Sequence, residues 1–271
     1  MQNFVGVLRA KRFSPNSADL PIMEAVAERL RGRGYSCRLV EEDDLSDELD
    51  EGDVYFSMAR GERARRKLGG LKRVVNESVA LAILSDRVAV YRRLREEGVA
   101  QPLSLVWTAE KADEYTQPCW LKSRSAYTTK AGDVRFVSSR EDMRACVAEF
   151  RERGVKEVLW QAHAAGDLIK FYSVAGTPFL HYCYPLEQRH EGKFGLEQYN
   201  GRPKHFTFNP TLIKEKLDRA AAGMRLKVYG ADIVVDEGGG WLVIDMNDWP
   251  SFRSCVGEAA PHIADVVEGL L

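Results

Sequence analysis

Three oxygen-bearing side chains stand near the end of the chain, in "GADIVVDEGGGWLVIDMNDWP" (residues 230–250). Asp245 and Asn247 are expected on one face of a strand, because strand side chains alternate between two faces. If the acidic, glycine-rich turn closes a hairpin, Asp232 can lie on the same face. Two carboxylates and an amide oxygen would form a hard, negatively charged site that suits Mg²⁺. The alternative is that Asp245 and Asn247 only form the turn before Pro250.

The first third of the chain is predicted to form a small α/β domain. Short buried strands are expected at 4–8, 35–42 and 53–59, and an amphipathic helix at 18–34 ends in glycine. The rest of the chain has runs of adjacent strands separated by single helices, which favours antiparallel sheets.

Helices are expected in this later part up to Gly98, from Ser139, across 211–226 and across 257–271. Ser139 is a candidate N-cap, because Asp142 follows it at the spacing of a capping box. Pro102 is expected to start a strand after the first of these helices.

The composition excludes several classes of partner. Lys and Arg (39) balance Asp and Glu (40), so no overall charge favours nucleic acid or a membrane surface. The chain has neither a long apolar run nor the pattern of a signal peptide, and we expect a cytoplasmic globular protein. The five cysteines form no C-x-x-C pair, which favours reduced core residues over disulfides or zinc.

A basic stretch, "ARGERARRKLGGLKR" (residues 59–73), follows the third predicted strand. It contains seven Lys or Arg residues against one Glu. One interpretation is a solvated helix and turn. The other is an entry surface for an anionic substrate, since guanidinium groups bind carboxylates and phosphates.

The order of motifs from residue 76 to 252 resembles the ATP-grasp superfamily. The resemblance rests on six features in order along the chain: Asn76 and Ser78; Asp86 and Arg87; "EGVAQPLS" (97–104); Lys122 with the loop "SRSAYTTKAGDV"; Gln161 ending "EVLWQA"; and Lys170 ahead of the acidic hairpin. It implies an α+β fold with three parts: a small N-terminal α/β domain (1–75), a central lid subdomain (76–160), and a C-terminal antiparallel sheet with helices (161–271).

The resemblance also implies roles in binding Mg-ATP. Lys122 would bind the inner phosphates, Arg87 the nucleotide from the other side, and Lys170 the ribose or the transferred group. The backbone after Trp160 and Gln161 would contact adenine, "SAYTTKAG" (125–132) would be the lid, and Asp167 would be a further cofactor contact. Asp232, Asp245 and Asn247 would hold one or two Mg²⁺ ions, or Mn²⁺ in their place.

Each of these residues also has a structural interpretation. The two lysines can be surface residues with buried stems, Arg87 can pair with a helix neighbour, and Trp160 can belong to the core.

Within the superfamily, two reactions remain open. Most members resemble carboxylate-amine or carboxylate-thiol ligases that form an acyl phosphate, as in glutamate-adding enzymes of ribosomal proteins and glutathione synthases. The pairs Asp245-x-Asn247 and Asp86-Arg87, together with Lys170, instead resemble inositol tris/tetrakisphosphate kinases, but the histidine loop of those kinases is missing. We favour the ligase; a nucleotide-binding module without catalysis is the third possibility.

Both reactions imply a small anionic substrate. Arg60, Arg63, Arg65, Arg66 and Lys67 of the basic stretch are its candidate binding residues. Arg253, beside the acidic hairpin, is a candidate catalytic residue together with Lys170.

Overall fold

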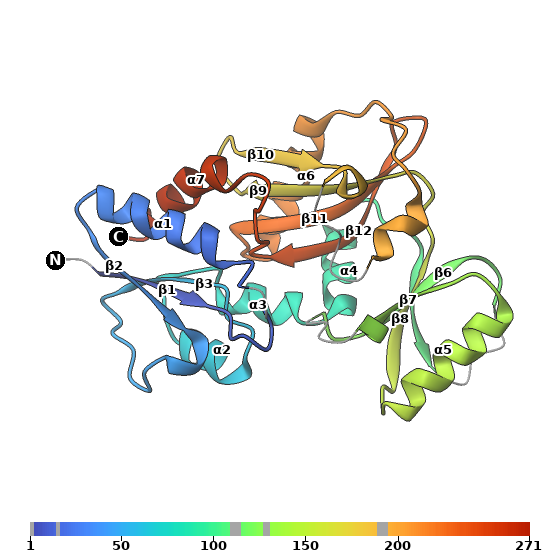
Figure 1. Ribbon diagram of the computed structural model, residues 1–271, viewed down its shortest axis with the longest axis horizontal. Coiled ribbons are helices and arrows are strands. Elements are labelled where there is room, and N and C mark those ends of the chain that lie inside the picture. The colour runs from blue at the N-terminus through green and yellow to red at the C-terminus, as the bar shows by residue number, and fades with distance from the viewer. Residues whose placement is uncertain (1–2, 15–16, 109–114, 127–130, 189–194) are drawn as a thin grey trace.

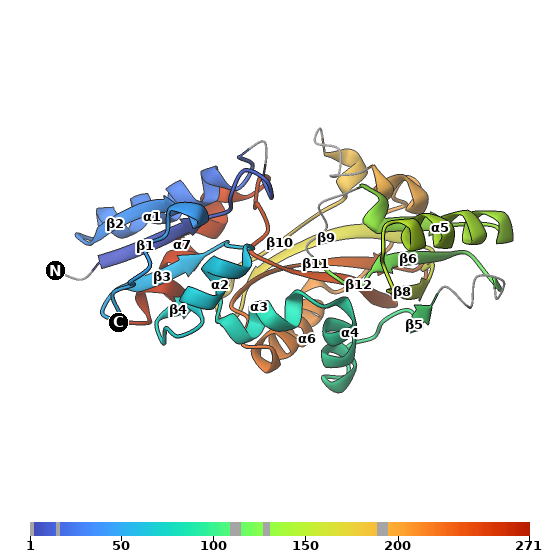
Figure 2. The ribbon, with the colours of Figure 1, turned by 90° about the horizontal axis from the view of Figure 1, so that it is seen from below.

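The computed structural model describes residues 3–14, 17–108, 115–126, 131–188 and 195–271. It contains three four-stranded sheets. The N-terminal and central sheets lie at opposite ends of the molecule, with the C-terminal sheet between them (Figure 1; Figure 2). No helix in these ranges is long and apolar enough to cross a membrane.

The N-terminal sheet is parallel, in the order β2-β1-β3-β4. Its strands are β1 (Asn3–Leu8), β2 (Ser36–Glu41), β3 (Val54–Ser57) and β4 (Val74–Val75). One face packs against α1 (Leu20–Gly32) and α7 (Val256–Glu268) in a single apolar core. The other face packs against α2 (Glu62–Leu68). The predicted α/β arrangement of the first third is confirmed, and the last helix of the chain returns to cover it.

The C-terminal sheet is antiparallel, in the order β10-β9-β11-β12. Its strands are β9 (Asp167–Val174), β10 (Leu180–Cys183), β11 (Val228–Val235) and β12 (Trp241–Asp248). One core joins this sheet to α3 (Ser78–Leu84), α4 (Arg87–Glu96) and α6 (Pro210–Gly223). The side chains of Lys170, Asp232, Asp245 and Asn247 lie on the opposite face.

The central sheet is also antiparallel, in the order β5-β8-β6-β7. Its strands are β5 (Ser104–Thr108), β6 (Cys119–Ser123), β7 (Val134–Val137) and β8 (Glu157–Ala162). Helix α5 (Arg140–Glu152) covers one face, and its N-cap Ser139 accepts a hydrogen bond from the Asp142 N–H as predicted. All five cysteines are buried and free.

The helix predicted to end at Gly98 is two helices, α3 and α4. The break lies at Ser85 and Asp86, where the Asp86 carboxylate caps α4 by accepting a hydrogen bond from the Val88 N–H. The Ser85 carbonyl accepts a hydrogen bond from the Ala126 N–H. An apolar run across both helices hides this break, because the N-cap aspartate sits inside a helical hydrophobic pattern.

The proposed limits of the three parts cut across packed elements in two places. The limit at 160/161 falls inside β8, and α7 packs with α1 rather than with the C-terminal sheet alone. A division of the chain into three contiguous segments therefore stays a proposal.

Asn76 joins the N-terminal part to the C-terminal sheet. Its fully buried amide donates to the Val228 carbonyl and accepts from the N–H groups of Lys227 and Val228 at 2.8–2.9 Å. Asn76→Ala is expected to lower the free energy of unfolding by about 3 kcal/mol, because it leaves buried backbone groups unpaired. Chemical denaturation would measure this, with Gln198→Ala at an exposed amide as the control; equal stability of both variants would contradict it.

Candidate active site

The acidic hairpin forms as β11 and β12, with Asp232 directly opposite Asp245 and Gly230 opposite Asn247. Asp232 is also opposite Lys170 of β9, and Lys170 is opposite Cys183 of β10. A single row of side chains therefore crosses all four strands. The prediction that Asp232 shares a sheet face with Asp245 and Asn247 is confirmed.

A β-bulge sets this arrangement. Asp232 pairs with Asp245 while Ile233 pairs with Val243, so Ile244 is an extra residue. The bulge moves β12 by one residue, so Val243 and Met246 both reach the core beneath the sheet although they are three positions apart in the sequence. Asp245 and Asn247 consequently point to the open face.

In this row Lys170 lies close to two carboxylates, and Asp232 also faces the Asp245 carboxylate. Lys170 Nζ lies 3.3 Å from Glu197 Oε1 and 4.0 Å from Asp232 Oδ1. The Asp232 carboxylate raises the pKa of Lys170. Burial lowers it, but this effect is smaller, so the pKa of Lys170 lies above its usual value. Burial raises the pKa of Asp232, Lys170 opposes that rise, and the facing Asp245 carboxylate adds to it. A cation between the two carboxylates would relieve their repulsion.

Lys122 reaches the row from the central sheet. Its Nζ donates to Gln161 Oε1 at 2.8 Å and to the carbonyl of the bulge residue Ile244 at 2.9 Å. The side chain is only 6% exposed. Burial lowers the pKa of Lys122 to about 8, although the nearby Asp245 carboxylate opposes this effect. The lysine is thus a buried cation that faces the acidic row from the other subdomain.

Arg87 lies at the start of α4, beside the same site. Its guanidinium donates to the Ser123 carbonyl at 2.8 Å and to the Ser125 carbonyl, at the end of β6. Burial lowers the pKa of Arg87. Arg87, Lys122, Gln161 and Asp245 line one small cavity of about 20 Å³. Residues 127–130 of the expected lid lie outside the described residues.

Trp160 and Gln161 point to opposite faces of β8. Trp160 is buried toward α5 and stacks on Trp107, with ring centroids 5.9 Å apart, while Gln161 contacts Lys122. Strands β5 and β6 flank the backbone of both residues. The backbone leaves the sheet after Ala162, so an adenine contact by main-chain groups would lie from His163 onward.

Trp120 is not among the predicted site residues, although strand alternation is sufficient to place it beside Lys122. It lies two residues before Lys122, and strand alternation therefore puts both on one face. Its indole N–H donates to His163 Nδ1 at 3.2 Å, and its ring lies 5.1 Å from Phe136 and 5.6 Å from Tyr199. This aromatic cluster borders the polar site. Tyr199 and Glu197 fall in a polar loop without periodicity, and no sequence signal indicates them.

Asp167 is buried at the start of β9. Its two carboxylate oxygens accept hydrogen bonds from the N–H groups of Lys204 and Phe206, at 2.7 and 2.8 Å. These bonds hold the segment that leads into α6. Asp167→Asn is expected to lower the free energy of unfolding by about 2 kcal/mol, because an amide nitrogen would face one of these donors. Unchanged stability in denaturant, with weakened nucleotide binding, would instead favour a direct cofactor contact.

The basic stretch divides into two groups. Arg63 and Lys67 pair with Asp47 at 2.7 Å, and Arg66 pairs with Glu62 one helical turn away. These contacts lie within the N-terminal part.

Arg60 instead reaches the end of the acidic hairpin, where its guanidinium lies 3.7 Å from the buried Asp248 carboxylate. Arg65 is half-buried on α2, and Arg253 is exposed in the turn before α7. Among the predicted substrate residues, Arg60 therefore lies close to the end of the hairpin.

The donors present fit a hard cation. In the parts of the chain that the structure describes, no three His, Cys, Asp or Glu residues converge as a metal site. Two facing carboxylates, with the Asn247 amide oxygen in the next cross-strand pair on the same face, give an incomplete oxygen shell. Mg²⁺ usually keeps such a shell and completes it with water and substrate phosphate oxygens.

Three solved structures are similar over nearly the whole chain. A RimK domain ATP-grasp protein from Sphaerobacter thermophilus has 21% identity and a TM-score of 0.71, covering 98% of this chain and 100% of its own. D-alanyl-alanine synthetase A from Vibrio cholerae has 11% identity and a TM-score of 0.72, covering 99% and 98%. D-alanine–D-alanine ligase from Bacillus anthracis has 14% identity and a TM-score of 0.70, covering 100% and 96%.

No family model matches the chain, and no curated protein sequence matches it. At these identities the likeness concerns the fold. The chain has the ATP-grasp fold, with mixed helices and sheets as the sequence predicted.

Proposed function

We propose that this protein is a Mg-ATP-dependent ligase that joins a small carboxylic acid to an amine or a thiol through an acyl phosphate. The observation that carries the proposal is the row Lys170, Asp232 and Asp245 facing the buried Lys122 across two subdomains. Opposed cations and carboxylates are what phosphoryl transfer requires, because it depends on positioning and charge neutralisation. The similar structures include a D-alanyl-alanine synthetase and a D-alanine–D-alanine ligase complexed with ATP, and these names support the same reaction class.

The chain's own residues divide the work. Asp232, Asp245 and Asn247 would hold the magnesium, which when bound neutralises phosphate oxygens and fixes their orientation. Lys122 would exchange its contacts with Gln161 and Ile244 for phosphate oxygens. Lys170, held between Glu197 and Asp232, would bind the ribose or the transferred phosphoryl group.

The other nucleotide and substrate roles follow from position. Arg87 would bind the nucleotide from the α4 side, and Trp160 would support the adenine strand from the core. The acceptor would enter beside Arg60, and Arg253 would neutralise the reacting group from the turn after the hairpin. A small anionic acceptor fits the cationic side chains there better than a nucleic acid or a membrane, and a cytoplasmic location remains part of the proposal.

Hydroxylamine trapping tests the reaction type. The γ-phosphoryl group of ATP passes to a carboxylate oxygen and ADP leaves; hydroxylamine nitrogen then attacks the carbonyl carbon and phosphate leaves, giving a hydroxamate. We expect a hydroxamate with at least one acid from a panel that is first screened by ADP release. Stable transfer of label from [γ-³²P]ATP to a polyol phosphate, without any hydroxamate, would favour an inositol phosphate kinase reaction instead. Nucleotide binding without stimulated ADP release by any acceptor would favour a non-catalytic module.

A further inference from the structure

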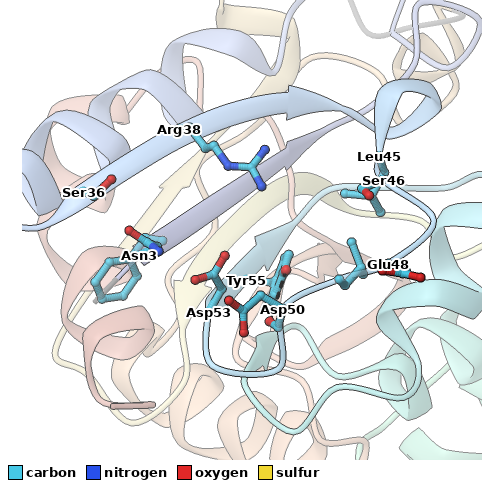
Figure 3. A pocket seen from close by; sticks show the side chains of 11 residues that line it. Asn3, Ser36, Arg38, Leu45, Ser46, Glu48, Asp50, Asp53 and Tyr55 are labelled. Atoms are coloured by element: carbon cyan, nitrogen blue, oxygen red, sulfur yellow. Dashed lines mark hydrogen bonds between the residues drawn. The ribbon is translucent and has the colours of Figure 1, made fainter. Parts of the chain in front are cut away.

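A second polar cavity, of about 420 Å³, lies in the N-terminal sheet domain (Figure 3). It is lined by the first residues of β1 and β2, by Asp53 and Tyr55 of the β3 region, and by the segment 45–50. All strands of this sheet run parallel, so their amino ends lie at one edge and their carboxyl ends at the other. Arg60 follows the carboxyl end of β3, whereas the cavity lies at the amino ends. It is therefore separate from the candidate active site.

The cavity places one cation opposite several carboxylates. Figure 3 shows Arg38 extending from β2 over the cavity, with Asp53 and Asp50 on its other side. Glu48 is a third acidic residue of the lining. Asp50 uses one carboxylate oxygen to accept the Gly52 N–H at 2.8 Å, which leaves its other oxygen for a ligand.

Asp53 is the carboxylate of the lining that is enclosed most by the protein. It is only 8% exposed, yet its carboxylate has neither a hydrogen bond nor an ion pair within the described part of the chain. Its oxygens are not among the fully buried polar atoms that lack a partner, so the carboxylate opens onto the cavity, where a cationic group of a ligand can pair with it. The neighbouring phenol responds to this charge: burial, and then the Asp53 carboxylate, raise the pKa of Tyr55.

We infer that this cavity binds a small amino acid with a basic side chain, whose carboxylate pairs with Arg38 and whose α-ammonium and side-chain cation pair with Asp53 and Asp50. A guanidinium group binds one carboxylate in a bidentate manner. Two other ligand classes fit less well. A polyamine carries no anionic group to pair with Arg38, and a phosphate compound would be repelled by the carboxylates of Glu48, Asp50 and Asp53. The volume lies within the range of small-molecule sites, roughly 300–1,000 Å³.

The cavity is connected to the active-site edge by one segment of chain. That segment begins at Glu42, whose buried carboxylate accepts the N–H groups of Ala10 and Arg60 at 2.8 and 3.0 Å. It then returns along the sheet to line the cavity at residues 45–50. A ligand there would order the same segment that fixes the backbone of Arg60.

Calorimetric titration of the full chain with L-lysine, L-ornithine and L-arginine tests the inference without any mutation. At least one should bind, whereas norleucine, which lacks the side-chain ammonium, and lysinamide, which lacks the carboxylate, should bind at least about tenfold more weakly. Asp53→Asn and Arg38→Gln should each weaken binding by a similar factor. Asp44→Asn, an exposed carboxylate on the same segment and outside the lining, should leave it unchanged.

Thermal unfolding of the ligand-free variants checks that each one folds. No binding of any of the three amino acids at about 10 mM would overturn the inference. A ligand that binds more weakly than this could not stabilise the protein measurably. Equal binding by the wild type and by Asp53→Asn or Arg38→Gln would overturn it as well. Mg-ATP binding should be the same in all three variants, so this result stands apart from that of the proposed ligase reaction.

Discussion

Replacing Asp245 with asparagine is expected to lower the rate of ATP turnover about a thousandfold, equal to about 4 kcal/mol of transition-state stabilisation. The variant keeps the shape of the side chain and its hydrogen bond to the Met246 N–H, but it removes one of two facing carboxylates. The remaining carboxylate and amide would hold magnesium weakly. Initial rates of ADP release over a range of magnesium concentrations would measure the effect, with partial recovery at high magnesium.

Stability separates this effect from misfolding. Loss of the Asp245 charge relieves its repulsion with Asp232 in the free protein, but it also removes its attraction for the buried Lys122 and Arg87. These effects oppose one another, so the free energy of unfolding should change by no more than about 1 kcal/mol. Glu237→Gln, which removes an exposed charge from the turn of the same hairpin, is the matched control and should retain full turnover. Wild-type rates in Asp245→Asn would exclude a role for this carboxylate in the reaction.

Replacing Lys122 with methionine should weaken nucleotide binding about 100-fold, equal to about 2.7 kcal/mol. Methionine removes the desolvation cost of a buried cation and keeps an apolar stem of similar length, but it leaves Gln161 Oε1 and the Ile244 carbonyl without their donor. We therefore expect the free energy of unfolding to fall by about 2 kcal/mol at most, so that the variant stays folded and the loss of affinity is measured on native protein. Calorimetric titration and chemical denaturation of the same preparation would measure both; unchanged affinity would exclude Lys122 as a phosphate ligand.

The lowered pKa of Lys122 adds a pH dependence to this prediction. With a pKa of about 8 in the folded protein and about 10.4 in the unfolded chain, the unfolded state binds more protons between these values. The contribution of Lys122 to stability therefore rises with pH across that window, and its burial penalty is complete below it.

Nucleotide phosphates would raise the pKa of Lys122, so binding near pH 8 should take up about half a proton. Calorimetry in two buffers of different ionisation enthalpy would detect this uptake, and Lys122→Met should abolish it. Equal proton uptake by the wild type and the variant would assign the proton to another group.

The sequence predicts which side chains of one strand share a face of the site, but it does not predict the register between β11 and β12. Strand alternation is sufficient to predict that Asp245 and Asn247 share a face. The pairing of Asp232 with Asp245 depends on the bulge at Ile244, and an apolar residue in an apolar run gives no sign of a bulge. The same alternation could have identified Trp120 from Lys122, whereas Glu197 lies in a loop whose position depends on tertiary contacts.

The overall architecture followed from periodicity and motif order, but some packing did not. The return of α7 to the N-terminal sheet is a contact between the two ends of the chain, and the pattern within each helix says nothing about its partner. The break between α3 and α4 also depends on tertiary contacts that the pattern within a helix does not show. Asp86 caps α4 and also accepts a hydrogen bond from Arg124, which is distant in the sequence.

A crystal structure with magnesium and a non-hydrolysable ATP analogue would test the central claim most directly. We expect a magnesium ion about 2.0–2.1 Å from oxygens of Asp245 and Asn247, with Asp232 in its first or second shell. Lys122 Nζ should lie within hydrogen-bonding distance of a phosphate oxygen, having left the Ile244 carbonyl. A nucleotide bound away from β12, or a metal ion that none of these three side chains contacts, would contradict the account.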